Sequence, residues 1–337
     1  MRTSGWAAAT FSATGGSGFP DARAIPVPMI LYGRSSLGYS AANDQETDMP
    51  TPAHDARIIV RDCSDRLGEG PTWSARENAL YWVDILGRRL NRLDLATDAV
   101  TSWDMPDTIG WVVEREDAPG FIAGLGRRFV ELTLDPVVIR TIAAPEDDRD
   151  GNRFNDAKAD SQGRIWAGSM PFTCDRPSGS FYRLDTNRTA TRVDDDYTIA
   201  NGPAIAADGS FLLHTDTALG TIFRYPLNDD GSLGARTPFI VFEDDWGSPD
   251  GMTFDADGGL WVGCWGGSCV TRFTPGGKRD RSIALPASQI TSCTFAGPDL
   301  DRMFVTSSGD GVDEKAGGAL FEIDPGVRGL PTLRYRG

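Results

Sequence analysis

The sequence predicts an all-β chain folded as a six-bladed β-propeller, and three observations support this prediction. A turn signal, a short aromatic or aliphatic strand and a small residue recur together six times. The repeats are spaced by roughly 40 to 48 residues, the length of a four-stranded blade. No segment has the periodicity of an amphipathic helix. The repeats are ENALYWVD, APGFIAGLG, SQGRIWAGSM, ADGSFLLHTD, ADGGLWVGCW and DLDRMFVTSS, aligned on Tyr81, Phe121, Ile165, Leu213, Leu260 and Met303.

The first 55 residues differ from the repeats in composition. They are rich in Gly, Ser, Ala, Thr and Pro and show no sustained periodicity. Such a segment cannot bury enough surface to offset the entropy of ordering. We therefore expect residues 1–55 to be disordered, or to be an extension upstream of a true start such as Met49. The propeller is expected over residues 56–337, and its first strand at 57–62.

Short strands between the repeats are expected to complete each blade. The stretches RLNRLDL, GSFYRLD, GTIFRYPL and CVTRFTPGG lie between turn signals and are interpreted as outer strands. Aspartates in the turns are expected to close hairpins, because Asp and Gly fit turn geometry well. These aspartates are Asp160, Asp208, Asp257 and Asp299. Functional residues must then lie outside these turns.

The charge balance argues against several classes of partner. Asp and Glu outnumber Lys and Arg by 48 to 33, which gives a formal net charge of -15, and no block of basic residues is present. We therefore expect neither a nucleic-acid nor a membrane partner. The longest apolar stretch near the N-terminus, residues 25–32, is far shorter than the roughly 20 residues of a membrane span. The expectation is a cytoplasmic protein, a monomer or weak homo-oligomer, whose five cysteines stay reduced.

Histidine is scarce, which limits the chemistry that the chain can perform. The two histidines are His54, in the N-terminal segment, and His214, in a predicted strand. No G-x-S-x-G motif accompanies them, so a serine-hydrolase triad is disfavoured. A zinc site rich in His or Cys is disfavoured for the same reason. We expect His214 to be structural.

Oxygen-bearing side chains at the starts of blades are the remaining candidates. Glu69 lies in LGEGPTW, Asn201 in IANGPA and Asp250 in GSPDGM. Taken singly, each is more commonly a turn residue. Together, they could converge on the central channel of a propeller, where their charge would need a cation. Glu, Asn and Asp suit Ca, Mg or Mn, with Zn or Fe(II) as alternatives.

Several motifs resemble the SMP-30/gluconolactonase family, also called the regucalcin family. They are LGEGPTW, LYWVDILGRRL, GRRFVEL, NRFNDAKADSQGRIWAGSM, IANGPAIAADG, SPDGMTFDADGGLWVGCWGG and ITSCTFAGPDLDRMFVTSS. The resemblance implies a six-bladed propeller with one divalent metal ion in its channel. It implies that the metal ligands are Glu69, Asn201 and Asp250, that Arg153 and Asn155 contact substrate, and that Asp156 lies nearby. The family's further acidic substrate contact is absent, and Thr173 stands at about its position.

The resemblance also implies the reaction, which is hydrolysis of a small lactone, with a sugar (aldono-) lactone as the expected substrate. A divalent ion can polarise the carbonyl oxygen and lower the pKa of water. Asp250 would serve as proton acceptor as well as ligand. Arg153 and Asn155 would orient the lactone. Two alternatives stay open, namely a non-catalytic calcium-binding or regulatory propeller, and an esterase or phosphotriesterase that uses the same site.

Three aromatic residues are further candidates for the mouth of the channel. They are Trp111, Phe154 and Trp265. An aromatic side chain in a propeller more commonly packs between blades, and we expect packing here.

Overall fold

The computed structural model describes residues 50–52, 56–61 and 63–337. The chain divides into two compact units, residues 1–36 and 37–337, and every described residue lies in the second. Those residues form 25 strands and one short 3-10 helix, η1 (Thr217–Leu219), with no α-helix among them. The prediction of an all-β fold is confirmed.

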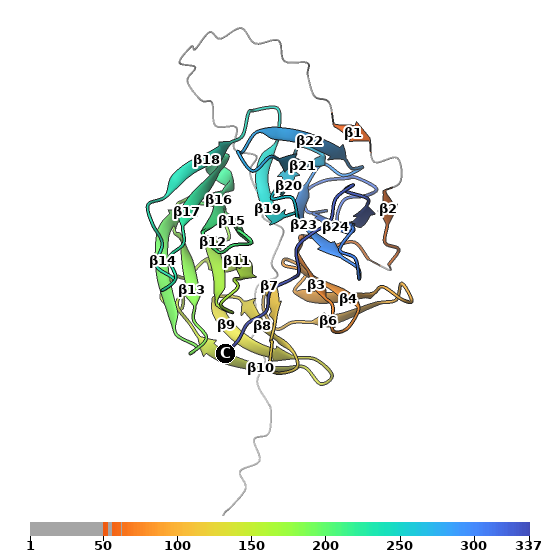
Figure 1. Ribbon diagram of the computed structural model, residues 1–337. Helices are drawn as coiled ribbons and strands as arrows, with labels where there is room; N and C mark the ends of the chain where they lie inside the picture. Colours follow the sequence, from red (N-terminus) through yellow and green to blue (C-terminus); the bar gives the residue numbers. More distant parts are fainter. Residues whose placement is uncertain (1–49, 53–55, 62) are drawn as a thin grey trace, which may run out of the picture. The chain divides into compact units, whose positions relative to one another are not determined.

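The strands form six sheets around a common centre (Figure 1). From the innermost strand outward, the first sheet consists of β3 (Gly68–Ser74), β4 (Ala79–Asp84), β5 (Arg89–Asp94) and β6 (Val100–Asp104). The second consists of β7 (Ile109–Glu114), β8 (Phe121–Leu125), β9 (Arg128–Thr133) and β10 (Val138–Ala143). The third consists of β11 (Asn152–Ala159), β12 (Ile165–Pro171), β13 (Gly179–Leu184) and β14 (Ala190–Tyr197).

The other three sheets follow the same order. The fourth sheet consists of β15 (Ala200–Ile205), β16 (Phe211–Asp216), β17 (Thr221–Pro226) and β18 (Thr237–Val241). The fifth consists of β19 (Ser248–Phe254), β20 (Leu260–Trp265), β21 (Cys269–Phe273) and β22 (Arg279–Ala284), with β1 (Thr51–Pro52) beside β22. The sixth consists of β23 (Ile290–Ala296), β24 (Arg302–Ser307), β25 (Leu320–Ile323) and β2 (Arg57–Ile58). Each innermost strand contacts the next, and β23 contacts β3, so the ring closes. The six blades are confirmed.

The six repeats found in the sequence are the second strands of the blades, β4, β8, β12, β16, β20 and β24. Each second strand is buried along nearly its whole length, because every sheet packs between two neighbouring sheets. A strand covered on both faces has a continuous apolar sequence, whereas a half-covered strand alternates. The outer strands β6 and β10 are largely exposed.

Buried tryptophan–aspartate pairs fix several blades. The indole Nε1 of Trp166 donates to Asp160 at 2.8 Å, and the same carboxylate accepts Arg164 at 2.6 Å. Trp261 and Asp255 repeat the indole contact at 2.9 Å. The expected structural role of Asp160 is confirmed. In the fifth blade, however, Asp255 and not Asp257 closes the hairpin, because Asp255 Oδ1 accepts the backbone N–H groups of that turn.

The N-terminal part of the described chain completes two blades. β2 pairs with β25 and supplies the outer strand of the last blade. β1 pairs in parallel with β22, so Thr51 and Pro52 belong to a sheet. The expected strand at 57–62 is shorter than predicted and ends at Ile58. Residues 1–49 and 53–55 of the expected tail lie outside the described residues.

The C-terminal segment crosses one end of the channel. Gly329 forms a bridge with Asp255, and Tyr335 with Arg115. Arg334 donates to the buried carboxylate of Glu114 at 2.9 Å. The segment thereby joins the fifth and second blades and covers this end of the channel.

Among the described helices, none has the length and apolar character needed to cross a bilayer.

Candidate functional site

A register shift interrupts the pairing of every innermost strand. The shifts lie at Glu69/Thr72, Ile109/Trp111, Phe154/Asp156, Asn201/Ala204, Pro249/Met252 and Ile290/Cys293. A bulge of this kind turns a side chain out of the ordinary alternation and is common beside functional sites. Glu69, Asn155, Asn201 and Asp250 all lie at or within these shifts.

Glycine permits the turn of the backbone at two of these positions. Gly70 follows Glu69 with φ of 53°, and Gly202 follows Asn201 with φ of 73°. Residues with a Cβ are strained in this region, so glycine is the fitting residue. The EG and NG pairs that mark these positions in the sequence are thus part of the strand geometry.

The predicted residues are brought together and buried. Glu69, Asn201, Asp250 and Arg153 come from four different blades, and each is between 2% and 5% exposed. The carboxyl groups of Glu69 and Asp250 lie in hydrogen-bonding contact. Asn155 Nδ2 donates to Asn201 Oδ1 at 2.6 Å. Burial at this level requires each charge to have a partner or a bound ion.

A chain of hydrogen bonds fixes the orientation of the two amides. Arg153 Nη1 donates to Asn155 Oδ1. Asn155 Nδ2 also donates to the Ala200 carbonyl at 2.8 Å. Asn201 Nδ2 donates to Thr217 Oγ1 at 2.9 Å, and this hydroxyl donates to the Pro249 carbonyl at 2.7 Å. The orientation of the Asn201 amide is therefore fixed at both of its polar atoms, with Oδ1 facing Asn155 and Nδ2 facing Thr217.

Replacing Thr217 by Val should loosen the site without unfolding the blade. The change removes the group that accepts from Asn201 Nδ2, so the amide can rotate. Loss of such an outer hydrogen bond commonly costs roughly 10- to 100-fold in metal affinity. Thr217→Ser keeps the hydroxyl and should retain affinity within a few-fold. Equilibrium metal binding measured by calorimetry checks this, and equal affinities for the Val and Ser variants would contradict it.

The carboxyl groups titrate abnormally because they are buried next to one another. Burial and the charge of Asp156 raise the pKa of Glu69 to about 8 from its usual 4.5. Burial, and next the charge of Glu69, raise the pKa of Asp250 well above its usual range. Burial raises the pKa of Asp156 to about 6, although the charge of Lys158 opposes this shift. Without a compensating cation, Glu69 and Asp250 retain protons at neutral pH, whereas Asp156 is largely ionised.

Chelator-treated protein should lose stability as the pH rises from about 4.5 to about 8. Across this window an unfolded chain releases the Glu69 proton, while the folded chain keeps it, because the folded pKa is the higher one. Folding thus becomes less favourable with rising pH, and Asp250 acts in the same direction. Denaturant unfolding at several pH values measures the slope. Glu69→Gln should flatten it, and an equal slope in both proteins would contradict the assignment.

The donor set fits a divalent ion. Oδ1 of Asp250 is buried and has no hydrogen-bond partner in the described part of the chain. A cation beside it would satisfy this oxygen and offset the repulsion between the two carboxylates. Among the described residues, no group of three or more His, Cys, Asp or Glu side chains is placed to hold a metal. A metal here would therefore depend on the amide of Asn201 together with Glu69 and Asp250, a set suited to hard cations.

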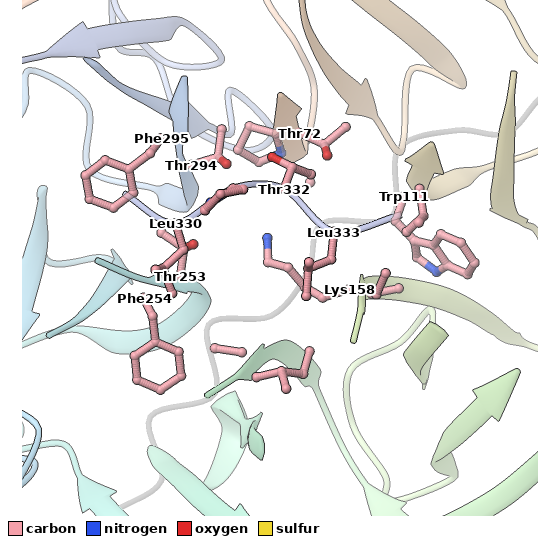
Figure 2. A pocket seen from close by; sticks show the side chains of 18 of the residues that line it. Thr72, Trp111, Lys158, Thr253, Phe254, Thr294, Phe295, Leu330, Thr332 and Leu333 are labelled. Carbon is pink, nitrogen blue, oxygen red and sulfur yellow. The ribbon is translucent and has the colours of Figure 1, made fainter. Parts of the chain in front are cut away.

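A chamber of about 230 Å³ lies behind this site, towards the end that the C-terminal segment crosses. Gly70 and Asp156 line it, and they are adjacent in sequence to Glu69 and Asn155. Figure 2 shows its close-up, in which the amino group of Lys158 reaches towards the middle and Thr332 and Leu333 of the C-terminal segment lie across it. The positive charge of Lys158 acts on the carboxyl group of Asp156, which lines the same chamber.

His214 does not contribute to the site. Its ring stacks on Phe181, with centroids 3.8 Å apart, and meets the edge of Tyr197 at 4.6 Å. Burial lowers its pKa to about 3, so it stays neutral. The expected structural role is confirmed. Trp111 and Phe154 are also packed between blades, with centroids 6.0 Å apart, as expected.

Two residues near the site were missed from the sequence. Glu146 is fully buried and accepts hydrogen bonds from Ser169, Tyr182 and Asn152, which fixes the start of β11. It lies in an acidic loop without any distinguishing pattern. Ser292 lies within the register shift of β23, and its Oγ is buried without a partner among the described residues. Alignment of ITSCTF with SPDGMTF sets Ser292 opposite Gly251, so the sequence carries no signal for it.

Comparisons with known proteins identify relatives of this chain. Residues 67–309 match the family described as SMP-30/Gluconolactonase/LRE-like region. Regucalcin of Gallus gallus is 35% identical over 81% of this chain and 95% of its own. Pentonolactonase XacC of Haloferax volcanii is 35% identical over 82% of this chain and 96% of its own. The crystal structure of a calcium-binding regucalcin from Agrobacterium tumefaciens superposes with a TM-score of 0.80 at 28% identity, over 86% and 99% of the two chains.

Proposed function

This chain belongs to the SMP-30/gluconolactonase/LRE-like family, and from that premise we propose that it hydrolyses a small sugar lactone with the help of one divalent metal ion. Lactone hydrolysis is represented in the family by the pentonolactonase relative. One observation supports the proposal most. Glu69, Asn201 and Asp250 are buried, the charges of Glu69 and Asp250 act on Arg153, and Asn155 links Arg153 to Asn201 by hydrogen bonds.

The reaction breaks the acyl C–O bond of the ring and adds water to the carbonyl carbon. The ring oxygen leaves as a hydroxyl, and the new acid ionises and releases a proton at neutral pH. When bound, a divalent ion supplies Lewis-acid polarisation of the carbonyl and lowers the pKa of water. No nucleophilic side chain is required, which agrees with the packing of His214 against Phe181 and Tyr197.

Asp250 is the proposed proton acceptor. One oxygen of its carboxylate can hold the ion while the other takes the proton of the attacking water.

Asn155 and Arg153 have different parts in the proposal. The two N–H donors of Asn155 Nδ2 are used by Ala200 and Asn201, so Asn155 positions the site. One lone pair of its Oδ1 is left to accept a hydrogen bond from a substrate hydroxyl. Arg153 keeps unused donors and is the stronger candidate for substrate contact.

A non-catalytic calcium-binding propeller is the second candidate, because the similar Agrobacterium protein is named as calcium-binding. Such a protein needs the oxygen ligands but not Arg153 beside them. The two candidates are separated by an assay of acid release on a panel of aldonolactones, with an aryl ester and a phosphotriester included. Turnover of a lactone that stops on chelation supports the proposal. Metal binding without any turnover favours the calcium-binding candidate.

A further inference from the structure

Arg153 is a buried cation that the protein holds by one side only. Its side chain is 5% exposed. Nη1 donates to the Phe154 carbonyl at 3.1 Å and to Asn155 Oδ1. The Phe172 ring lies against the guanidinium, with Cζ 5.8 Å from the ring centroid. These contacts fix the plane of the group.

The opposite edge of the guanidinium has no protein partner. Nε is buried without a hydrogen bond. Among the described residues, the hydrogen bonds of the guanidinium come from Nη1, and no carboxylate forms an ion pair with it. The Nε and Nη2 donors of arginine point in parallel and match the two oxygens of a carboxylate. A buried donor pair of this kind is costly unless a ligand satisfies it.

The charges around Arg153 also leave it without a counter-ion once a divalent cation is bound. The carboxylates that act on it are those of Glu69 and Asp250, and a divalent cation would offset both charges. Asp156 is opposed by the charge of Lys158. The positive charge of Arg153 is then the one left over in the site.

The neighbouring loop does not supply the missing anion. Burial raises the pKa of the Cys174 thiol, so the thiol beside Arg153 stays neutral. Asp175 accepts a hydrogen bond from Thr173 and lies 3.7 Å from Arg176, so its carboxylate already has partners on the loop. We infer that the preferred substrate is a lactone with a second, anionic group, a carboxylate that binds the Nε and Nη2 edge of Arg153. This inference rests on the proposed lactonase function and specifies its substrate class.

The test uses two lactones with the same ring and the same stereochemistry. One derives from an aldonic acid and ends in a primary alcohol, and the other is the monolactone of the matching aldaric acid and ends in a carboxylate. The metal-loaded full chain should favour the second in kcat/KM by roughly tenfold or more, as expected for a hydrogen bond between charged groups. Most of the difference should lie in KM. Ionic strength is matched, because the chain carries a formal charge of -15 and repels anions.

Variants locate the origin of the preference. Arg153→Gln should bring the ratio of the two kcat/KM values close to one. Arg153→Lys keeps the charge but not the paired donors and should give an intermediate ratio. Arg176→Gln changes an exposed arginine on the loop that carries Asp175, and it should leave the ratio as in the wild type.

Each outcome is decisive. If both lactones are hydrolysed equally well, the inference is wrong while the lactonase proposal stands. If the preference survives in both Arg153→Gln and Arg153→Lys, the carboxylate binds elsewhere and the assignment to Arg153 is overturned. If neither lactone nor any other in the panel is hydrolysed, the proposed function fails, and the substrate class fails with it.

Discussion

Replacing Asp250 by Asn should lower turnover at saturating metal by at least roughly a hundredfold, the usual minimum for losing a general base. The change preserves side-chain volume and an oxygen for the ion, but it removes the negative charge and the ability to accept a proton. Metal affinity should fall moderately. Steady-state hydrolysis of the best lactone, with metal occupancy measured in the same samples, checks the prediction.

Asp208→Asn is the matched control for this change. Asp208 lies in an exposed turn, where its carboxylate accepts a hydrogen bond from the Ser210 backbone at 2.9 Å. The substitution has the same chemistry but lies in an exposed turn outside the buried carboxyl cluster, and turnover should stay near that of the wild type. If Asp250→Asn with bound metal retains more than a tenth of wild-type turnover, Asp250 is at most a ligand, and another group accepts the proton.

Removing the metal should lower both activity and thermal stability. A ligand that binds only the folded state adds about 2.7 kcal/mol when its free concentration is a hundredfold above the dissociation constant. Chelation should therefore lower the Tm by several degrees and abolish lactone hydrolysis. The drop in Tm should grow as pH rises towards 8, because the metal-free folded chain then keeps a Glu69 proton that the unfolded chain has released.

Glu69→Gln provides the comparison for metal removal. This variant lacks one of the two carboxylates, so chelation should change its Tm much less than that of the wild type. Equal responses of the two proteins to chelation would place the metal away from Glu69. A wild-type Tm and activity that ignore the chelator would contradict the metal assignment altogether.

The fold could be predicted from the sequence because each blade repeats the same local pattern. The second strand of each blade is buried on both faces, so its apolar run stands out from its surroundings, as in ALYWVD of β4. The pairing of Thr51 and Pro52 with β22 could not be predicted, because two residues carry no periodicity and the contact spans most of the chain.

The candidate site was predicted only in part. Glu69, Asn201 and Asp250 stand next to glycine or proline at blade starts, so their positions are visible in the sequence. The free edge of Arg153 is not visible, because it depends on which of its nitrogens the surrounding backbone and amides occupy. Thr217 was missed for a similar reason, since its hydroxyl meets Asn201 only after β15 and β16 have paired.

The central claim is that lactone hydrolysis by this protein requires a metal ion held by Glu69, Asn201 and Asp250. This claim has one direct test. Chelator-treated protein is titrated with a divalent metal while bound metal and lactone hydrolysis are measured in the same samples. The account predicts that activity returns in proportion to occupancy and is complete at one ion per chain, and that Asp250→Asn binds the ion without recovering activity. Full activity before any metal is added, or one bound ion in the wild type with no hydrolysis of any lactone in the panel, would contradict it.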